Sequence, residues 1–478
     1  MTLRKTVKDI GIIGISRVLT SLTGIILMPV LTKNLGAYGY GLWAQVGVTV
    51  SLSVMILRLG LPLSIKRLFP GKEIIEIRKD FYSIVIFVFL ISTTFAVLLY
   101  LFPNILANAI FEGEIDIVRA VAIIIVVSSL DVIFLTTIRA FREMKKYAII
   151  NVASTYTFVG LAILLVLSGY GIWGPIFAML IVKGSLSILL FIMLSTKLTF
   201  KKPDFSSLKE YLSFGIPAMP AGISHIIVDM SDRYIIGIFL GATFVGYYTP
   251  GYSLGLKFSL LISGILSMVL LPALSEYYEN NNIKLVKRII KLSLKFFLLI
   301  SIPAAVGLII VGKPILLLLT TPDIAQQSYI ILVVSAFIGI MIGIYTIFKQ
   351  VLFLKKKTKL ITYYWGVCAA VNFAGNLILI PTMEILGAAI STVISYLLIV
   401  ILISHFSYKN FEINVDFTAI IKIVLTTLLM GLTLYLIKIF IWSNPFFLIV
   451  LGIIIYFITL YFIGGFNKKE IRFLKTLY

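Results

Sequence analysis

Eight charged residues lie deep within long apolar segments of the 478-residue sequence. Five are basic and three are acidic: Arg17, Arg58, Lys183, Arg233 and Lys257, with Asp131, Asp229 and Asp232. If these segments cross a membrane, each charge near the midplane costs about 2.5–3.5 kcal/mol, so we expect it to face a water-filled cavity or a partner. The excess of bases favours an anionic guest, such as a phosphate or diphosphate. The five bases are therefore candidate substrate-binding residues, and the three acids are candidates for ion coupling or for a gate.

Three of these eight charges lie in one stretch, VDMSDRYIIGIFLG, residues 228–241. In a helix, spacings of three and four residues place His225, Asp229 and Asp232 on one face. Two interpretations stay open. Asp229 and Arg233, which are four residues apart, can neutralise each other as a purely structural pair. Alternatively, the acids form a proton- or sodium-sensitive element, because burial and neighbouring carboxylates both change proton affinity.

The depth of each base within its segment separates two groups. With a rise of 1.5 Å per residue, Lys183 and Lys257 lie about 16 and 18 Å from the outer ends of their predicted helices, close to the midplane. Arg17 and Arg58 are predicted nearer to the inner surface, where a long side chain can extend to the lipid head groups. For these two arginines, substrate binding and interfacial anchoring both stay open.

The segments that position these residues are long enough to cross a membrane. Hydrophobic residues make up 60% of the chain and charged residues 13%, against about 25% charged in a soluble domain. A bilayer core of about 30 Å requires roughly 20 apolar residues in a helix. The sequence therefore predicts an all-α integral membrane protein with fourteen transmembrane helices. The predicted spans cover residues 10–31, 41–63, 82–102, 118–138, 147–167, 172–195, 211–238, 245–271, 293–312, 327–348, 360–380, 386–406, 417–437 and 445–466.

The lysines and arginines between the predicted spans alternate between crowded and sparse gaps. The gaps on the side of the N-terminus hold thirty of them, and the opposite gaps hold only Lys33, Lys313 and Lys438. Because cytoplasmic loops are enriched in lysine and arginine, this bias predicts that both termini are cytoplasmic. The positions of the charges also argue against nucleic-acid binding, despite a net charge of +21.

Two pairs of similar segments indicate an internal repeat. LGAYGYG (35–41) is matched by LGATFVG (240–246), and GIWGPIFAMLI (171–181) by EILGAAISTVI (384–394). The similar offsets predict two pseudo-symmetric six-helix bundles related by an axis along the membrane normal. The predicted domains are an N-terminal bundle at 1–196, a cytoplasmic linker at 197–210, a C-terminal bundle at 211–407, and two helices with a cytoplasmic tail at 408–478.

Catalytic and metal sites are not expected. The chain contains one cysteine, Cys368, and two histidines that lie far apart, His225 and His405. Neither a disulfide framework nor a cysteine-based metal site is therefore predicted. The longest predicted outer gap, residues 103–117, contains no histidine or basic residue, and we find no glycine-rich nucleotide loop. A membrane enzyme such as a glycan polymerase or a glycosyltransferase is thus disfavoured against a transporter.

Three segments carry a resemblance to a known family. They are GISRVLTSLTGIILMPVLTKNLGAYGYGLW (14–43), FGIPAMPAGISHIIVDMSDRYIIGIFLGATFVGYY (214–248) and NLILIPTMEILGAA (376–389). The DRYIIG core of the second segment, followed by G-x-x-x-V-G-Y, is the most specific. In these segments and their order the chain resembles the polysaccharide-biosynthesis flippases of the multidrug/oligosaccharidyl-lipid/polysaccharide exporter superfamily.

The resemblance implies two bundles around a central cavity that rock between inward-open and outward-open states. The guest is then a lipid-linked oligosaccharide of the polyprenyl or dolichyl diphosphate type, with its tail among the membrane lipids, and Arg17 is the first candidate to bind it. We expect a monomer in the plasma (inner) membrane, without a cofactor and with coupling to protons or sodium. The alternative is a cation-coupled small-molecule or multidrug exporter of the same fold. Such exporters use acidic residues in their cavities, whereas the first predicted span carries Arg17 and no acid.

Overall fold

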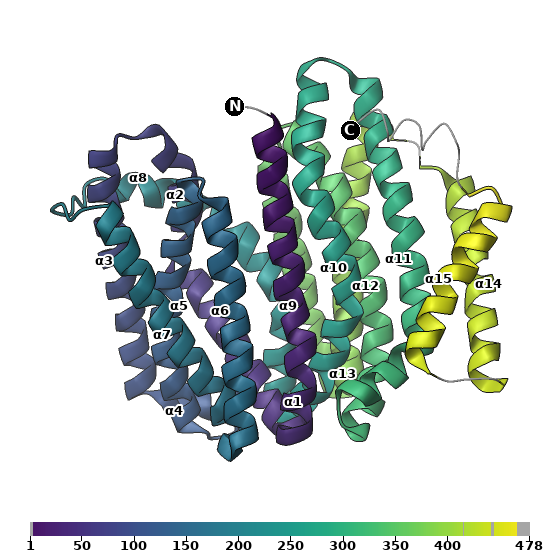
Figure 1. The fold of residues 1–478 in the computed structure, drawn as a ribbon, viewed down its shortest axis with the longest axis horizontal. Coiled ribbons are helices and arrows are strands. Elements are labelled where there is room, and N and C mark those ends of the chain that lie inside the picture. Colours follow the sequence, from purple (N-terminus) through teal and green to yellow (C-terminus); the bar gives the residue numbers. More distant parts are fainter. Residues whose placement is uncertain (1–2, 414, 441–443, 466–478) are drawn as a thin grey trace. The chain divides into compact units, whose positions relative to one another are not determined.

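The computed structural model describes residues 3–413, 415–440 and 444–465. These residues form fifteen α-helices and contain no β-strand (Figure 1). The helices are α1 (Leu3–Leu57), α2 (Leu61–Leu68), α3 (Ile74–Leu101), α4 (Pro103–Ile110), α5 (Ile115–Ala140), α6 (Met144–Leu165), α7 (Trp173–Lys197), α8 (Leu208–Gly215), α9 (Met219–Leu240), α10 (Ala242–Glu279), α11 (Ile283–Leu319), α12 (Pro322–Leu354), α13 (Thr358–Phe411), α14 (Phe417–Phe440) and α15 (Pro445–Phe462).

Twelve helical segments among the described residues are long and apolar enough to cross a membrane. The two longest, Gly11–Leu57 and Thr358–Phe411, each contain a sharp bend, at Gly36 (φ 65°) and at Glu384 (φ 52°). Dividing these two segments at their bends yields fourteen membrane-crossing helices, so the predicted all-α membrane fold is confirmed. The apolar runs form helices because a backbone within a bilayer must satisfy its own hydrogen bonds.

The chain divides into two compact units. Unit 1 extends to Gly246 and includes Asn376–Glu384, while unit 2 contains Tyr247–Gly375 and the chain from Ile385 onward. Unit 1 thus holds α1 to α9, and unit 2 holds α11, α12, α14, α15 and most of α10 and α13. The division predicted from the repeat, with a linker at residues 197–210, stays a prediction.

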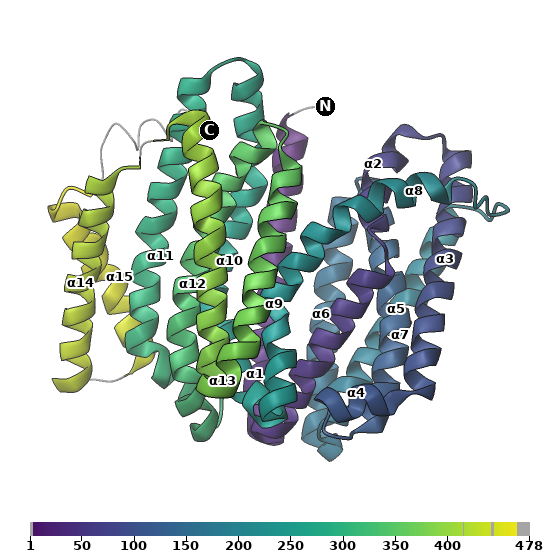
Figure 2. The same ribbon diagram turned by 180° about the vertical axis from the view of Figure 1, so that it is seen from behind.

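Helix α5 lies at the centre of unit 1, where α1, α2, α3, α4 and α7 all pack against it (Figure 2). Its apolar residues are spread around the whole helix, which is the pattern of a helix buried on every side. Ile124 of α5 packs in one apolar cluster with Val46 of α1, and Phe134 packs in another with Phe81 of α3. This central position places Asp131 of α5 inside the unit, where it is 1% exposed.

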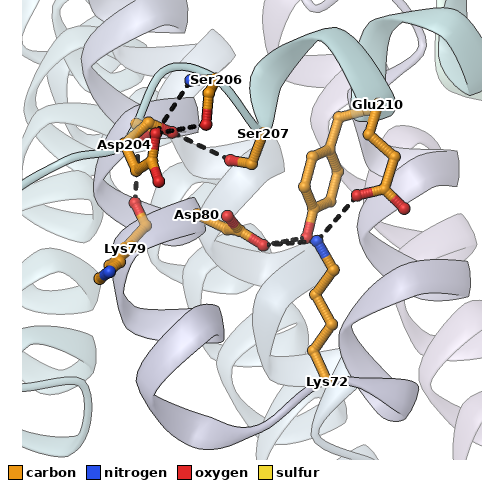
Figure 3. Close-up of polar contacts among 9 residues, drawn as sticks. Lys72, Lys79, Asp80, Asp204, Ser206, Ser207 and Glu210 are labelled. Carbon is orange, nitrogen blue, oxygen red and sulfur yellow. Dashed lines mark hydrogen bonds and ion pairs between the residues drawn. The ribbon is translucent and has the colours of Figure 1, made fainter.

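Helices α2 and α8 lie together at one end of unit 1, and α4 lies at the other end (Figure 1, Figure 2). Lys72 holds α8 in place, because its Nζ contacts the carboxylates of Asp80 and Glu210, each at 2.9 Å (Figure 3). The Tyr211 hydroxyl donates a hydrogen bond to the same Asp80 oxygen at 2.7 Å. Burial lowers the pKa of Lys72, but the hydrogen bonds and charges of Glu210 and Asp80 outweigh it, and the net pKa is raised. The network joins the segment after α7 to the start of α3.

Candidate functional site

Asp232 and Arg233 form a buried ion pair on α9. The Asp232 side chain is fully buried, and that of Arg233 is 10% exposed. Nη1 of Arg233 donates to the Asp232 carboxylate at 3.1 Å and to the backbone carbonyl of Asp229 at 2.7 Å. The backbone N–H of Arg233 also donates to the Asp232 carboxylate, at 2.8 Å. Because each charge offsets the desolvation cost of the other, neither residue can be removed alone without leaving a buried charge.

Asp229 makes a different pair on a more accessible part of α9. Its carboxylate lies 3.1 Å from Nδ1 of His225, and the two side chains are 27% and 44% exposed, respectively. The sequence placed His225, Asp229 and Asp232 on one face, but the structure divides them between an accessible histidine–carboxylate pair and a buried arginine–carboxylate pair. The contact of Arg233 with Asp229 uses the backbone carbonyl of Asp229.

Helix α9 packs along the second half of α1 inside unit 1. The Gln45 side-chain amide donates a hydrogen bond to the Arg233 carbonyl at 2.8 Å, and Gly222 lies against the side chain of Met55. Residue numbers rise along α1 while those of the partners fall along α9, so the two segments are antiparallel. Sequence reasoning missed Gln45, whose only signal was a polar side chain within an apolar run.

Glycines bring the two repeated LGA segments into backbone contact. A Cβ atom on Gly41 would lie 1.8 Å from the carbonyl oxygen of Ala242, and one on Gly246 would lie 1.9 Å from the carbonyl oxygen of Ala37. Gly41 and Gly246 hold equivalent positions in LGAYGYG and LGATFVG, as do Ala37 and Ala242. The same contact is therefore made twice with the partners exchanged, as expected across a local two-fold axis.

The first glycine of each LGA segment adopts nearly the same conformation. Gly36 has φ 65° and ψ −172°, and Gly241 has φ 89° and ψ 173°. This combination of positive φ and extended ψ is accessible essentially only to glycine. The backbone N–H of Ala242, which follows Gly241, donates to the Glu112 carboxylate at 2.5 Å. The two glycines thus end one helix and begin the next at matching places in the repeat.

Another ion pair links α5 to α7 within unit 1. Nζ of Lys183 lies 3.6 Å from the Asp131 carboxylate, and the two side chains are 35% and 1% exposed, respectively. The predicted midplane base and the predicted coupling acid are therefore neighbours. The sequence could not show that Asp131 and Lys183 form a pair, because they lie on different helices, α5 and α7, and α6 lies between them in the chain.

Arg58 belongs to a cluster of positive charges that sequence reasoning missed. It is half-buried in the turn after α1, near Lys66 of α2 and Arg139 of α5. Partial burial lowers the pKa of the Lys66 ammonium, and the charges of Arg139 and Arg58 lower it further. The Arg139 guanidinium also lies 5.0 Å from the ring centre of Tyr147. Lys66 and Arg139 were counted only as topology signals, and their proximity to Arg58 becomes visible only in the folded chain. We refer to Arg58, Lys66 and Arg139 as the basic cluster.

The remaining two predicted bases are not brought into these pairs. Arg17 is exposed on α1, and its side chain makes no hydrogen bond or ion pair with the residues that the structure describes. Lys257 is half-buried on α10 in unit 2. Unit 1 therefore holds four of the five predicted bases and all three predicted acids.

Two comparisons by sequence, with a family model and with a curated relative, each match more than half of the chain. The model of a family described as polysaccharide biosynthesis protein matches residues 30–323, which is more than half of the chain. The probable low-salt glycan biosynthesis flippase Agl15 of Haloferax volcanii is 22% identical over 367 residues, which cover 75% of this chain and 77% of that protein.

Comparisons by structure establish the fold. The chain is similar to the lipid II flippase MurJ in an inward closed conformation, with a TM-score of 0.74 and 18% identity over 94% of this chain and 98% of that chain. It is also similar to an inward-facing multidrug resistance MATE family transporter of the MOP superfamily, with a TM-score of 0.66 and 14% identity over 82% and 94% of the two chains. The region matched by the family model contains both LGA segments and the Asp131–Lys183 and Asp232–Arg233 ion pairs. The chain belongs to the polysaccharide biosynthesis protein family.

Proposed function

We propose that the protein is a flippase that moves a lipid-linked, diphosphate-bearing oligosaccharide from the cytoplasmic to the outer leaflet by alternating access. This transport would serve the synthesis of a cell-surface polysaccharide or glycoconjugate. Family membership supports the proposal, as do the names of two similar proteins, which describe flippases of low-salt glycan biosynthesis and of lipid II. The protein is a multi-pass membrane transporter and not an enzyme. In the proposal it lies in the plasma (inner) membrane with both termini cytoplasmic, as the distribution of lysine and arginine predicts.

The position of Lys183 is the observation that carries the proposal. Lys183 lies about 15 Å along α7 at 1.5 Å per residue, close to the middle of this 25-residue helix. Its side chain remains 35% exposed even though its Nζ is paired with Asp131. A charge exposed to lipid at this depth costs about 2.5–3.5 kcal/mol. We therefore infer that the exposed surface of Lys183 meets water, where a positive charge suits an anionic guest.

The basic cluster supports the same class of guest. Arg58, Lys66 and Arg139 lie at the end of unit 1 that the sequence predicts to be cytoplasmic. Guanidinium groups bind phosphate oxygens through two parallel hydrogen bonds, and a nearby ammonium adds a further positive charge. A cluster of this kind would meet a diphosphate on the leaflet where a flippase collects its substrate. Asp131 and the Asp229–His225 pair are the proposed sites at which protons or sodium act on transport.

Thiol labelling tests whether Lys183 faces water. Lys183→Cys is made in a Cys368→Ala background, because the single native cysteine is buried. A hydrophilic, membrane-impermeant maleimide should label this cysteine from at least one side of the membrane. Ile181→Cys is the matched control, since Ile181 lies on the same helix and is 55% exposed, but on a different face. It should react with a membrane-permeant maleimide and not with the hydrophilic one. If the hydrophilic reagent does not label Lys183→Cys from either side of the membrane, no aqueous path reaches this residue.

A transport assay separates the flippase from a cation-coupled exporter. The purified protein is reconstituted into vesicles and supplied with a polyprenyl diphosphate-linked oligosaccharide or with an organic cation. The proposal expects movement of the lipid-linked glycan, and it expects that Lys183→Gln and Arg58→Gln reduce this movement. Transport of the organic cation alone, with no effect of either basic residue, would support the exporter instead.

A further inference from the structure

Unit 2 contains a cavity that none of the proposed transport residues line. It has a volume of about 440 Å³, and its walls come from the ends of α10, α11 and α13 and from the turn between α12 and α13. Among the described residues, its lining includes Lys287, Lys355 and Lys409, and Glu412 is the only acid in it. The distribution of lysine and arginine predicts that these helix ends are cytoplasmic. The cavity is therefore positively charged and is expected to open at the inner membrane surface.

The lysines of this cavity are only weakly neutralised by the protein itself. Lys287 lies 3.7 Å from the Glu412 carboxylate, whose side chain is 78% exposed, so water screens the pair. Lys355 rests on two aromatic rings, with its Nζ 5.0 Å from the centre of Phe411 and 5.7 Å from that of Tyr278. These rings support the ammonium by cation–π contact without cancelling its charge. Neither Lys355 nor Lys409 pairs with an acidic side chain among the described residues.

An apolar cleft lies on the other side of the last turns of α13. It has a volume of about 330 Å³ and is lined by Phe348, Ser404, His405, Tyr408, Ile413 and Val415. Tyr408 and Lys409 are consecutive in sequence, yet the first lines the apolar cleft and the second lines the lysine cavity. The end of α13 therefore separates a cationic hollow from an apolar one at the same end of the helix.

We propose that the two hollows together bind one anionic phospholipid of the cytoplasmic leaflet. Its phosphate is held by Lys287, Lys355 and Lys409, and part of an acyl chain occupies the apolar cleft. The pairing of the two hollows favours an amphiphile over a soluble phosphate compound, because a soluble compound would leave the apolar cleft empty. The inference does not depend on the transport proposal, since it uses none of the same residues.

Lipid binding to the purified full-length protein tests this proposal. Thermal unfolding in detergent is followed while short-chain phosphatidylglycerol is added, with phosphatidylcholine of the same chain length in parallel. Phosphatidylglycerol should stabilise the protein, and phosphatidylcholine should not. In the Lys287→Gln/Lys355→Gln/Lys409→Gln variant, the apparent affinity for phosphatidylglycerol should fall on the order of a hundredfold, since each lysine near an anionic surface contributes about a factor of five.

A matched variant controls for the general positive charge of this face. Lys284, Lys357 and Lys359 are exposed in the same three-helix region but do not line the cavity. The Lys284→Gln/Lys357→Gln/Lys359→Gln variant loses the same charge and should bind phosphatidylglycerol nearly as the unmodified protein does. Glu412→Gln should bind it more tightly, because this variant removes the carboxylate that lies beside Lys287. An equal loss in both triple variants would overturn the proposal in favour of non-specific attraction to a basic surface.

Two further arms identify the source of the phosphate. Inorganic phosphate and glycerol phosphate are titrated in place of the lipid, and each should stabilise the protein far less than phosphatidylglycerol. The Ser404→Trp variant, which fills part of the apolar cleft, should weaken lipid binding and leave the response to glycerol phosphate unchanged. Stabilisation by glycerol phosphate equal to that by the lipid would overturn the lipid assignment and indicate a soluble phosphate ligand.

Discussion

Gly41 and Ala242 are in such close backbone contact that a Cβ atom on Gly41 would lie 1.8 Å from the Ala242 carbonyl oxygen. The same contact recurs between Gly246 and Ala37. Both contacts join the second half of α1 to the start of α10, within unit 1. They pack main chain against main chain, which small residues at helix crossings allow in membranes.

A methyl group at either glycine should therefore force the two helices apart. We expect Gly41→Ala and Gly246→Ala each to lower the free energy of unfolding by about 1–3 kcal/mol, the usual range for overpacking. Gly47→Ala is the control, because Gly47 lies on the same helix with open space around it. It should be neutral or stabilising by up to about 1 kcal/mol, since alanine favours a helix more than glycine does. Thermal unfolding of the purified variants measures the difference, and equal stability of Gly41→Ala and Gly47→Ala would contradict the close packing.

Loss of charge at the two acids of α9 should affect the stability of the protein to different degrees. Asp232→Asn leaves the buried Arg233 without its carboxylate, so we expect a loss of about 3 kcal/mol or more in stability. The double variant Asp232→Asn/Arg233→Gln removes both charges and should recover part of that loss. A double variant that is less stable than Asp232→Asn would argue against charge pairing as the cause. Levels of protein in the membrane and thermal unfolding provide the measurements.

Asp229→Asn, in contrast, should leave stability nearly unchanged, because the pair of Asp229 with His225 is accessible to water. We expect this variant, and also His225→Gln, to change the dependence of transport on pH or sodium. The measurement is initial transport rate in vesicles over a range of pH and sodium concentration. Identical ion responses in both variants and in the unmodified protein would restrict this pair to a structural role.

Arg17 is predicted to bind the diphosphate of the guest. It is exposed, and its side chain has no partner among the described residues, so the guanidinium is available to a ligand. Arg17→Ala should abolish transport, and Arg17→Lys should retain only part of it, because an ammonium cannot make the two-pronged contact. Lys33→Ala, on the same helix, serves as a control for loss of one positive charge. If lysine substitutes almost fully at position 17 and alanine has little effect, Arg17 acts as an interfacial anchor.

Asp416 should make the stability of α14 dependent on pH. Its carboxylate accepts the Ala419 N–H at 3.0 Å at the start of the helix and lies 3.5 Å from Lys291. The Ala419 hydrogen bond lowers the Asp416 pKa, partial burial opposes this, and Lys291 lowers the pKa further, so the net pKa is below the usual value. A lowered carboxylate pKa stabilises the folded state above the unfolded pKa of about 3.9, and this contribution is lost as the pH falls through the lowered pKa.

Two variants at this position separate the cap from the charge. Asp416→Ala should lower the free energy of unfolding by about 1 kcal/mol at neutral pH, as removal of a helix cap usually does. Asp416→Asn keeps a hydrogen-bond acceptor and should destabilise the protein less than Asp416→Ala does. The asparagine does not titrate, so this variant should lose the part of the pH dependence of stability that comes from Asp416. Thermal unfolding at neutral pH and below about pH 4 distinguishes them, and an unchanged pH profile in Asp416→Asn would assign the acid sensitivity to other groups.

The membrane-crossing helices could be predicted from sequence because the signal is local. About 20 consecutive apolar residues specify a helix in a bilayer whatever the rest of the chain does. Both bends lie in gaps between predicted spans, Gly36 in the gap at 32–40 and Glu384 in the gap at 381–385. The sequence did not show that the helix on each side continues directly up to a single bent residue. The LGA repeat was visible in the sequence, but the similarity of two segments does not show that they are in contact in the folded protein.

The sequence by itself determined the membrane fold, the family and the set of charged residues that have to be neutralised or hydrated within apolar helices. Only the tertiary structure decided how these charges are shared: Asp131 with Lys183, Asp232 with Arg233, and Asp229 with His225. Hydropathy depends on neighbours along the chain, whereas a side chain finds its partner through the rotation of its helix and through packing against residues that are distant in sequence. The same reason applies to three residues that the sequence analysis did not select. Packing of α1 against α9 brings Gln45 to the Arg233 carbonyl, and packing of α2 against α5 brings Lys66 and Arg139 close to Arg58.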